Sequence, residues 1–314
     1  MMKVTRTNNN PFSQIVFLFG PTGVGKTSLL TKLCKDQFTV INADSVQVYK
    51  GLDIGSAKVS QEQMKLAPHK LIDILQPWEQ FSVAKFIDEA DKAVEAIAAD
   101  KRIPILSGGT AYYFKHFYYG LSDAPKSNEE TRRHVAAWIE KVGLAAAREK
   151  LKEIDPISYN KIAANDSYRI ARALEVFEDS GKPRSSFGIP TTPRHDMNPL
   201  IIGLKRSPEE MERRMRLRFS LMMEAGLLDE VRKLIREGAK PDWPGMQGIG
   251  YREFFSAIEN GEDSLSSIGD AIVRNSRLYA KRQLTFFKSF ANVHWIDAEN
   301  EEEVIKLVNS YVQA

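Results

Sequence analysis

The sequence predicts an α/β protein in which a parallel sheet is flanked by helices and interrupted by an all-helical insertion. Three observations predict this class. Short apolar runs, typical of buried strands, alternate with segments of helical periodicity through the first 120 residues. The first of these runs ends in a glycine-rich loop that opens a helix. The middle of the chain shows helical patterns only, and a strand pattern resumes after it.

The first part of the core is expected at residues 12–120. Its buried strands are expected at residues 14–19, 38–41 and 103–106, and its helices at residues 26–35, 82–99 and 112–119. Strands that alternate with helices in this way pair in parallel and are covered on both faces. Residues 1–11, which precede the first strand, are polar and are expected to form a flexible tail.

The insertion is expected at residues 121–197. It begins with the polar connection LSDAPKSNEE, and residues 181–199 contain four prolines without an apolar period. The second part of the core, residues 198–314, is expected to contain the C-terminal helices. Its strands are expected at residues 200–204 and 293–296, and its helices at residues 208–225, 227–237, 251–260 and 264–290.

The composition is that of a globular protein, with 43% hydrophobic and 27% charged residues. The net charge of +3 permits a nucleic-acid partner without requiring one. Cys34 is the single cysteine, which excludes an internal disulfide and fits a reducing compartment. The polar N-terminus does not resemble a signal peptide, and no long apolar run predicts a membrane span. We therefore expect a cytoplasmic protein.

The strongest motif is GPTGVGKT, which matches the phosphate-loop pattern G-x-x-x-x-G-K-[ST]. Its glycines allow backbone N–H groups to converge on one anion, and the helix that follows adds the positive end of its dipole. The lysine supplies a full charge, and the last hydroxyl can bind Mg²⁺. The alternative is a glycine-rich turn without a ligand. The residues expected to bind a diphosphate or nucleotide are Gly20, Pro21, Thr22, Gly23, Val24, Gly25, Lys26 and Thr27.

Asp44 follows the second strand, at the edge where parallel sheets bind their ligands. It could bind magnesium or act as a general base, although an aspartate at such a place can also cap a helix or stabilise a turn. The third strand ends in Ser107-Gly108-Gly109-Thr110 rather than in the aspartate that most phosphate-loop NTPases use for magnesium. This difference favours an enzyme that binds a diphosphate without hydrolysing a nucleotide.

Basic residues are clustered in three places. Arg274, Arg277, Lys281 and Lys288 share one face of the last long helix, because their spacing follows the helical repeat. Further clusters lie at residues 213–218 and 168–172. One basic stripe is usually a solvated surface, but three of them favour a phosphate backbone as the partner. The five histidines show no metal-ligand spacing, so no structural metal site is expected.

Seven strings occur in a fixed order: GPTGVGKT, NADSVQVYKGLDIGSAK, PHKLIDI, SGGTAYYF, RALEVFEDSGK, QGIGYRE and YAKRQLTFFK. Together they resemble the tRNA dimethylallyltransferases, also called tRNA isopentenyltransferases, over residues 15 to 295. The resemblance implies a P-loop kinase-like fold with a helical insertion that grips the anticodon stem-loop of tRNA. It implies transfer of a dimethylallyl group from dimethylallyl diphosphate to the exocyclic amine of the adenosine beside the anticodon, with Mg²⁺. A monomer is expected.

The resemblance also implies roles for individual residues. Asp44 matches the family's general base, and Arg218, chosen over Arg214, its diphosphate-binding arginine. Thr27, from the phosphate-loop motif, is the expected magnesium ligand and is counted with these catalytic residues. A second set of matched positions, which again includes Asp44, contacts the tRNA in the family. They are Asp44, Ser45, Val46, Gln47, Thr110, Arg132, Tyr168, Arg169, Ile170, Ala171, Arg172, Gln247, Gly248, Ile249, Gly250, Tyr251, Arg252, Lys281, Arg282, Gln283 and Lys288.

Two other functions share the phosphate loop. A kinase acting on a small metabolite explains the loop but not the basic clusters. An RNA-binding GTPase-like switch needs a base-specificity motif such as NKxD, which the sequence lacks. A related transferase that acts on free adenine nucleotides would need neither the insertion nor the basic C-terminal helix.

Overall fold

The structure is a computed structural model that describes residues 10–34, 37–188, 190–261 and 264–313. The chain divides into two compact units. The main unit combines Met1–Tyr118 with Pro193–Ala314, and the second unit is Tyr119–Thr192. Of the expected tail, residues 1–9 lie outside the described residues. Asn10 is part of a turn, because its side chain accepts a hydrogen bond from Phe12 N and donates one to the His195 carbonyl.

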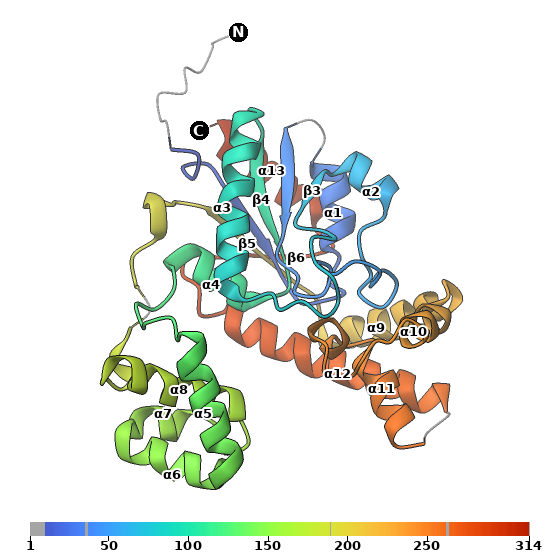
Figure 1. Cartoon of the computed structure of the whole chain (residues 1–314). Coiled ribbons are helices and arrows are strands. Elements are labelled where there is room, and N and C mark those ends of the chain that lie inside the picture. The colour runs from blue at the N-terminus through green and yellow to red at the C-terminus, as the bar shows by residue number, and fades with distance from the viewer. Residues whose placement is uncertain (1–9, 35–36, 189, 262–263, 314) are drawn as a thin grey trace. The chain divides into compact units, whose positions relative to one another are not determined.

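The main unit is built on a six-stranded parallel sheet with the order β3-β2-β4-β1-β5-β6 (Figure 1). The strands are β1 Val16–Phe19, β2 Phe38–Asn42, β3 His69–Lys70, β4 Ile103–Gly108, β5 Leu200–Lys205 and β6 His294–Asp297. The α/β class with a parallel sheet flanked by helices is therefore confirmed, as are the five strands expected from the sequence. The short edge strand β3 was not expected, because two residues carry no detectable apolar pattern.

Nine α-helices of the main unit accompany this sheet in the part of the chain that the structure describes. They are α1 Lys26–Leu33, α2 Gln61–Leu66, α3 Val83–Ala99, α4 Ala111–Tyr119, α9 Pro208–Glu224, α10 Leu227–Arg236, α11 Arg252–Glu259, α12 Leu265–Phe287 and α13 Glu301–Gln313. Helices α2 and α13 were missed from the sequence. The first is too short for periodicity, and the second begins with three acidic residues that resemble a loop.

The two faces of the sheet have different cores. Val16 and Leu18 of β1 point into an aliphatic cluster with residues of α1, α9 and α13. Phe17 and Phe19 point to the opposite face, where Phe19 stacks on Phe287 of α12 with ring centroids 4.0 Å apart. Alternating side chains thus bury both faces of a central strand, as parallel sheets require.

Local signals fix where the helices begin. The Ser82 hydroxyl accepts a hydrogen bond from Lys85 N at the start of α3, and Ser207 caps α9 through Glu210 N, with Pro208 at the first helical position. Both are preferred residues at these positions. Gly226, with a φ of +96°, separates α9 from α10. The start and the end of α9 are therefore fixed, and with them the positions of its arginines along the helix.

The second unit contains only helices among its described residues: α5 Glu129–Val142, α6 Leu144–Ile154, α7 Pro156–Lys161 and α8 Ser167–Ser180, with a short 3₁₀ turn at Arg184–Ser186. Val135, Leu151 and Ile170 belong to its core. The unit ends at Thr192, before the expected boundary at residue 197. Arg194 already belongs to the main unit, since it donates to the Phe117 carbonyl at 3.2 Å and pairs with Asp91.

Candidate active site

The phosphate loop connects β1 to α1 and is shaped by its glycines. Gly23 and Gly25 have φ values of +87° and +118°, which residues with a side chain rarely adopt. A Cβ atom on Gly20 would lie 2.8 Å from the Leu204 carbonyl oxygen of β5. Lys26 Nζ donates to the carbonyl oxygens of Gly20 at 2.8 Å and Pro21 at 3.1 Å. The ammonium group of Lys26 is therefore held against the first residues of the loop, at the start of a helix.

Three arginines surround this loop. Arg206 Nε donates to the Val24 carbonyl at 2.9 Å, and Arg214 Nε donates to the Gly23 carbonyl at 2.8 Å. Arg218 lies one helical turn after Arg214 on α9 and donates to the Ser56 carbonyl at 3.3 Å. Cationic side chains thus approach the loop from outside while its own lysine lies within it. This arrangement fits a ligand with several negative charges.

Asp44 lies at the same edge of the sheet, just after β2. Its Oδ1 accepts hydrogen bonds from Val46 N at 2.9 Å and Gln47 N at 3.4 Å, so its carboxylate heads a turn. Burial lowers the pKa of Lys26 to about 8, an effect that the nearby Asp44 carboxylate opposes and Arg218 reinforces. Burial also lowers the pKa of Arg218, and Asp44 again opposes the shift. These three groups therefore interact electrostatically.

The SGGT turn after β4 holds the Asp44 segment in place. A Cβ atom on Gly108 would lie 2.2 Å from the Ala43 carbonyl oxygen, so only glycine permits this approach. Thr110 N donates to that same carbonyl at 3.1 Å, and the Thr110 hydroxyl accepts a hydrogen bond from Ser45 N at 3.1 Å. Thr110 thus contacts the residues on both sides of Asp44.

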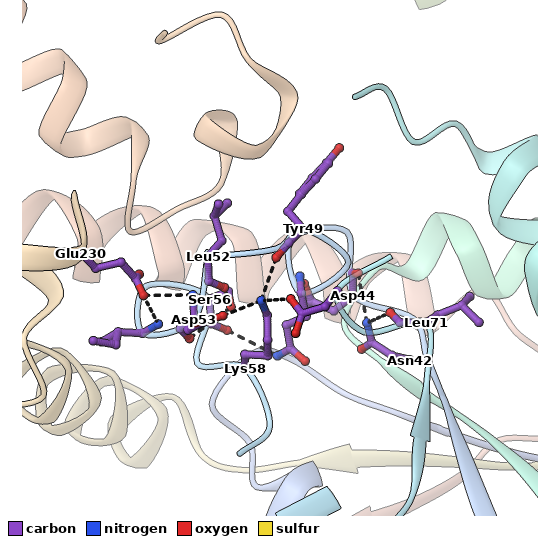
Figure 2. Close-up of polar contacts among 12 residues, drawn as sticks. Asn42, Asp44, Tyr49, Leu52, Asp53, Ser56, Lys58, Leu71 and Glu230 are labelled. Carbon is purple, nitrogen blue, oxygen red and sulfur yellow. Dashed lines mark hydrogen bonds and ion pairs between the residues drawn. The ribbon is translucent and has the colours of Figure 1, made fainter. Parts of the chain in front are cut away.

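The GLDIGSAK segment, residues 51–58, forms a loop that is fixed from both ends (Figure 2). At one end, Glu230 of α10 accepts hydrogen bonds from Asp53 N, Ile54 N and Gly55 N, at 2.8 to 3.0 Å. At the other end, Lys58 donates to the Tyr49 carbonyl at 2.7 Å. The loop is therefore well ordered where it approaches Arg218.

Lys58, the cationic residue of this loop, has a side chain that is only 5% exposed. It forms ion pairs with Asp53 (Figure 2) and with Asp73. Two carboxylates and a carbonyl compensate its buried charge, as a buried lysine requires. The Gln47 amide also bonds to this loop, through the Ala57 carbonyl at 3.2 Å. The loop thus joins the Asp44 turn to α9 and α10.

Two cavities meet between these elements. The larger, of about 750 Å³, is lined by the phosphate loop, the GLDIGSAK loop and α9. The smaller, of about 230 Å³, is lined by Ser45, Val46, residues 247–250 and 252, and the inner face of α12. Both cavities share five lining residues, namely Thr22, Gly23, Asp44, Arg218 and Met222. Asp44 and Arg218 therefore stand where the two cavities join.

The other residues that the resemblance singles out have varied surroundings. Lys281, Arg282 and Lys288 are exposed on α12, and Arg282 also lines the smaller cavity. Tyr251 is fully buried, with its hydroxyl donating to Glu230 at 2.7 Å, and its ring fills the space above Gly55. Gln283 is buried between two loops. For Tyr251 and Gln283, the side chains bond within the protein.

In the second unit, the matched residues lie on α5 and α8. Tyr168 is 79% exposed and Arg169 pairs with Asp166, whereas Ile170 is part of the core. Arg172 donates to the Pro125 carbonyl at 2.6 Å, and Arg132 to the Ser127 carbonyl at 2.7 Å. Ala171 is half-buried. The exposed residues of this set are thus Tyr168 and Arg169 at the N-terminus of α8 and Arg132 on α5.

Part of the basic charge on α9 and α12 is paired within the protein. Arg277 pairs with Glu212 at 2.9 Å, and Arg213 with Glu210 at 2.8 Å. Arg216 pairs with both Glu212 and Asp270. Exposed pairs of this kind contribute little stability. They reduce the local positive charge, so the sequence pattern overstates it at these positions.

Sequence reasoning missed four residues of the site: Arg206, Glu230, Lys58, and Tyr279, which lines the smaller cavity. Arg206 precedes a helix in a plain polar connection, and Glu230 looks like one acid on an amphipathic helix. Their roles depend on loops distant in sequence. Lys58 ends one of the seven strings and could have been found, because a lysine in a glycine-rich string needs an explanation. Tyr279 is one of several aromatic residues beside the basic face of the last long helix.

The site also bears on metal binding. Within the ranges that the structure describes, no group of three His, Cys, Asp or Glu side chains could hold an ion. Thr27 lines the larger cavity beside Lys26. Mg²⁺ is commonly bound through few protein ligands together with substrate phosphates. The Thr27 hydroxyl thus fits a magnesium ion that arrives with a diphosphate. In that same described part, no helix is long and apolar enough to cross a bilayer.

Comparisons with known proteins give one consistent family. The model of the family described as IPP transferase matches residues 47–290. A tRNA dimethylallyltransferase of Borrelia hermsii is 40% identical over 299 residues, covering 94% of this chain and 98% of the relative. One of Clostridioides difficile is 37% identical over 300 residues, covering 95% and 96%.

Solved structures agree with these relatives. The tRNA isopentenylpyrophosphate transferase of Bacillus halodurans is similar with a TM-score of 0.70 at 34% identity, covering 96% of this chain and 97% of that one. A eukaryotic dimethylallyltransferase acting on tRNA has a TM-score of 0.80 at 26% identity, covering 96% and 80%.

Proposed function

The chain belongs to the IPP transferase family, the tRNA dimethylallyltransferases, and from this premise we propose how its site works. The reaction transfers a dimethylallyl group from dimethylallyl diphosphate to the exocyclic amine of the adenosine beside the tRNA anticodon, and releases pyrophosphate. The observation that carries the mechanism is the pair of cavities that share Asp44 and Arg218. A donor in one cavity and an acceptor in the other would meet at these two side chains.

The larger cavity is the place for the donor diphosphate. The loop amides, Lys26 and Arg218 surround it, and Arg214 borders it. Diphosphate oxygens would replace the two carbonyls to which Lys26 now donates. As the carbon–oxygen bond of dimethylallyl diphosphate breaks, negative charge grows on the leaving pyrophosphate. The loop amides, Lys26 and Arg218 stabilise this charge by hydrogen bonds. Bound Mg²⁺, held by Thr27 and the diphosphate, would offset part of that charge.

The smaller cavity is the place for the acceptor base. An adenine inside an RNA stack cannot reach this depth, so the nucleotide must flip out. Its exocyclic amine is a weak nucleophile, because its lone pair is delocalised into the ring. Asp44 stands at the junction and takes the amine proton as the new carbon–nitrogen bond forms. The turn that fixes Oδ1 keeps the carboxylate in place for this transfer.

The tRNA would extend from the smaller cavity over exposed basic residues. Lys281, Arg282 and Lys288 provide phosphate contacts on α12, while Tyr168 and Arg169 offer an exposed tip on α8 of the helical unit. Phosphate contacts position an RNA without reading its sequence. We propose that residues 247–252 of the main unit also contact the tRNA, as do Arg132 and Arg172 of the helical unit, although Gln247, Arg132 and Arg172 also bond to nearby backbone carbonyls. In this proposal the protein is a cytoplasmic monomer.

The comparisons favour this transferase over a kinase acting on a small metabolite. The decisive test uses dimethylallyl diphosphate labelled in its prenyl group, Mg²⁺ and an anticodon stem-loop RNA with an adenosine-rich loop. We expect label on one adenosine and release of pyrophosphate. Consumption of ATP with a small acceptor, with the RNA left unlabelled, would overturn the proposal.

A further inference from the structure

Gln283 of α12 joins two loops of the active site. Its side chain is 3% exposed. Oε1 accepts a hydrogen bond from Thr22 N of the phosphate loop at 3.1 Å, and Nε2 donates to the Gly109 carbonyl at 2.6 Å. A backbone N–H can only donate and a carbonyl can only accept, so only one orientation of the amide satisfies both partners. The amide is therefore a fixed bridge between the loops that follow β1 and β4.

The SGGT turn leaves space for this amide. A Cβ atom on Gly109 would lie 2.4 Å from Gln283 Nε2. Such a distance cannot be sustained, so any larger residue at position 109 would displace the glutamine. Gly109 has no positive φ that would itself demand glycine. The second glycine of the turn is thus explained by the side chain of Gln283.

Tyr279, one helical turn earlier, lines the smaller cavity together with Asp44 and Ser45. Burial, and next the nearby Asp44 carboxylate, raise the pKa of Tyr279, so the hydroxyl stays neutral. Thr110 in turn receives Ser45 N at 3.1 Å. The inner face of α12 therefore contacts the phosphate loop through Gln283 and lines the cavity beside Asp44 through Tyr279.

The structure assigns Gln283 as a positioning residue for the donor diphosphate. By holding Thr22 against Gly109, it fixes the phosphate loop relative to the Asp44 segment. In the proposed complex, the exposed residues Lys281 and Lys288, the C-cap of α12, contact RNA, whereas the buried Gln283 bonds to the two loops. This assignment depends on the proposed function only where RNA binding is concerned. The role of Gln283 at the phosphate loop can be tested through the affinity for pyrophosphate alone.

The first test replaces the amide while keeping its size. Gln283→Met removes both hydrogen bonds, so the loop loses a defined position. We expect the Kd for pyrophosphate with Mg²⁺, measured by titration calorimetry, to rise about tenfold, equivalent to about 1.4 kcal/mol. The KM for the donor should rise with it. The Kd for an anticodon stem-loop RNA should stay within about twofold, because Gln283 neutralises no RNA phosphate.

Thr285→Val is the matched control, because Thr285 is exposed on the same helix and its hydroxyl bonds only to the Lys281 carbonyl among its described contacts. It should change neither affinity. RNA affinity that falls in Gln283→Met while pyrophosphate affinity is unchanged would overturn the assignment. If the wild-type protein binds pyrophosphate but no RNA, the proposed function fails and the pyrophosphate arm still decides the role of Gln283.

A double-mutant cycle tests the bridge itself. Gly109→Ala alone should weaken pyrophosphate binding about as much as Gln283→Met, because the new methyl group displaces the amide. In a Gln283→Ala background the methyl group finds free space, so Gly109→Ala should add almost nothing. Losses that simply add in the double variant would show that the two residues act independently, and the proposal would be wrong.

Discussion

Replacing Glu230 with alanine should remove the side chain that fixes the backbone of the GLDIGSAK loop. The carboxylate accepts three backbone hydrogen bonds from this loop and one from the Tyr251 hydroxyl. The loop amides can turn to water, but Tyr251 is fully buried and its hydroxyl would be left without an acceptor. An unsatisfied buried donor costs about 1–3 kcal/mol. With the lost charge-assisted bonds, we expect Glu230→Ala to lower the free energy of unfolding by roughly 3 kcal/mol.

Tyr251→Phe separates the two contributions. In the wild-type background it removes one hydrogen bond and should cost about 1 kcal/mol. In the Glu230→Ala background it removes an orphaned hydroxyl, so it should be neutral or stabilising. Urea denaturation followed by circular dichroism measures all four proteins. A Tyr251→Phe cost that is the same in both backgrounds would refute the idea that this hydroxyl depends on Glu230.

Three further predictions concern the reaction. Burial lowers the pKa of Lys26 to about 8, and bound pyrophosphate should raise it by stabilising the ammonium, so binding takes up a proton and weakens as pH rises above about 8. Calorimetry in buffers of different ionisation enthalpy measures that uptake, and an affinity independent of pH would contradict it. Arg218→Gln should lower kcat by about a hundredfold, because charge on the leaving pyrophosphate loses a donor. The control Arg216→Gln, whose guanidinium pairs with Glu212 and Asp270 at the surface, should retain the wild-type rate. Lys281→Glu should flatten the dependence of log K for RNA on log salt, whereas Lys306→Glu on α13 should not; equal slopes in both would place Lys281 off the RNA.

The sequence predicted the strands and the phosphate loop because their signals are local. A run such as VFLF is buried wherever a sheet is parallel, and GPTGVGKT specifies its own turn. Asp44 was placed correctly at the edge of the sheet for the same reason. Helix α13 could not be seen, since its apolar residues are diluted by charge and its helix depends on packing Val304 and Val308 on the sheet.

The interactions that hold the site together could not be predicted, because they join residues far apart in sequence. Glu230 binds a loop 175 to 177 residues earlier, and Gln283 reaches Thr22 over 261 residues. A glutamate or glutamine on an amphipathic helix gives no sign of such a partner. The two cavities likewise arise only when α9, α12 and three loops are brought together. The roles of individual residues rest on the family resemblance, and the structure adds that Asp44 and Arg218 line both cavities.

In the proposed mechanism Asp44, at the junction of the two cavities, is the base that activates the acceptor amine. Asp44→Asn keeps the size of the side chain and an oxygen that can accept from Val46 N, but removes the basic group. Mass spectrometry of tRNA nucleosides after incubation with dimethylallyl diphosphate and Mg²⁺ tests this directly. We expect dimethylallyl-adenosine with the wild-type protein, and formation slower by about a hundredfold or more with Asp44→Asn at unchanged RNA affinity. Wild-type rates with Asp44→Asn would contradict the account.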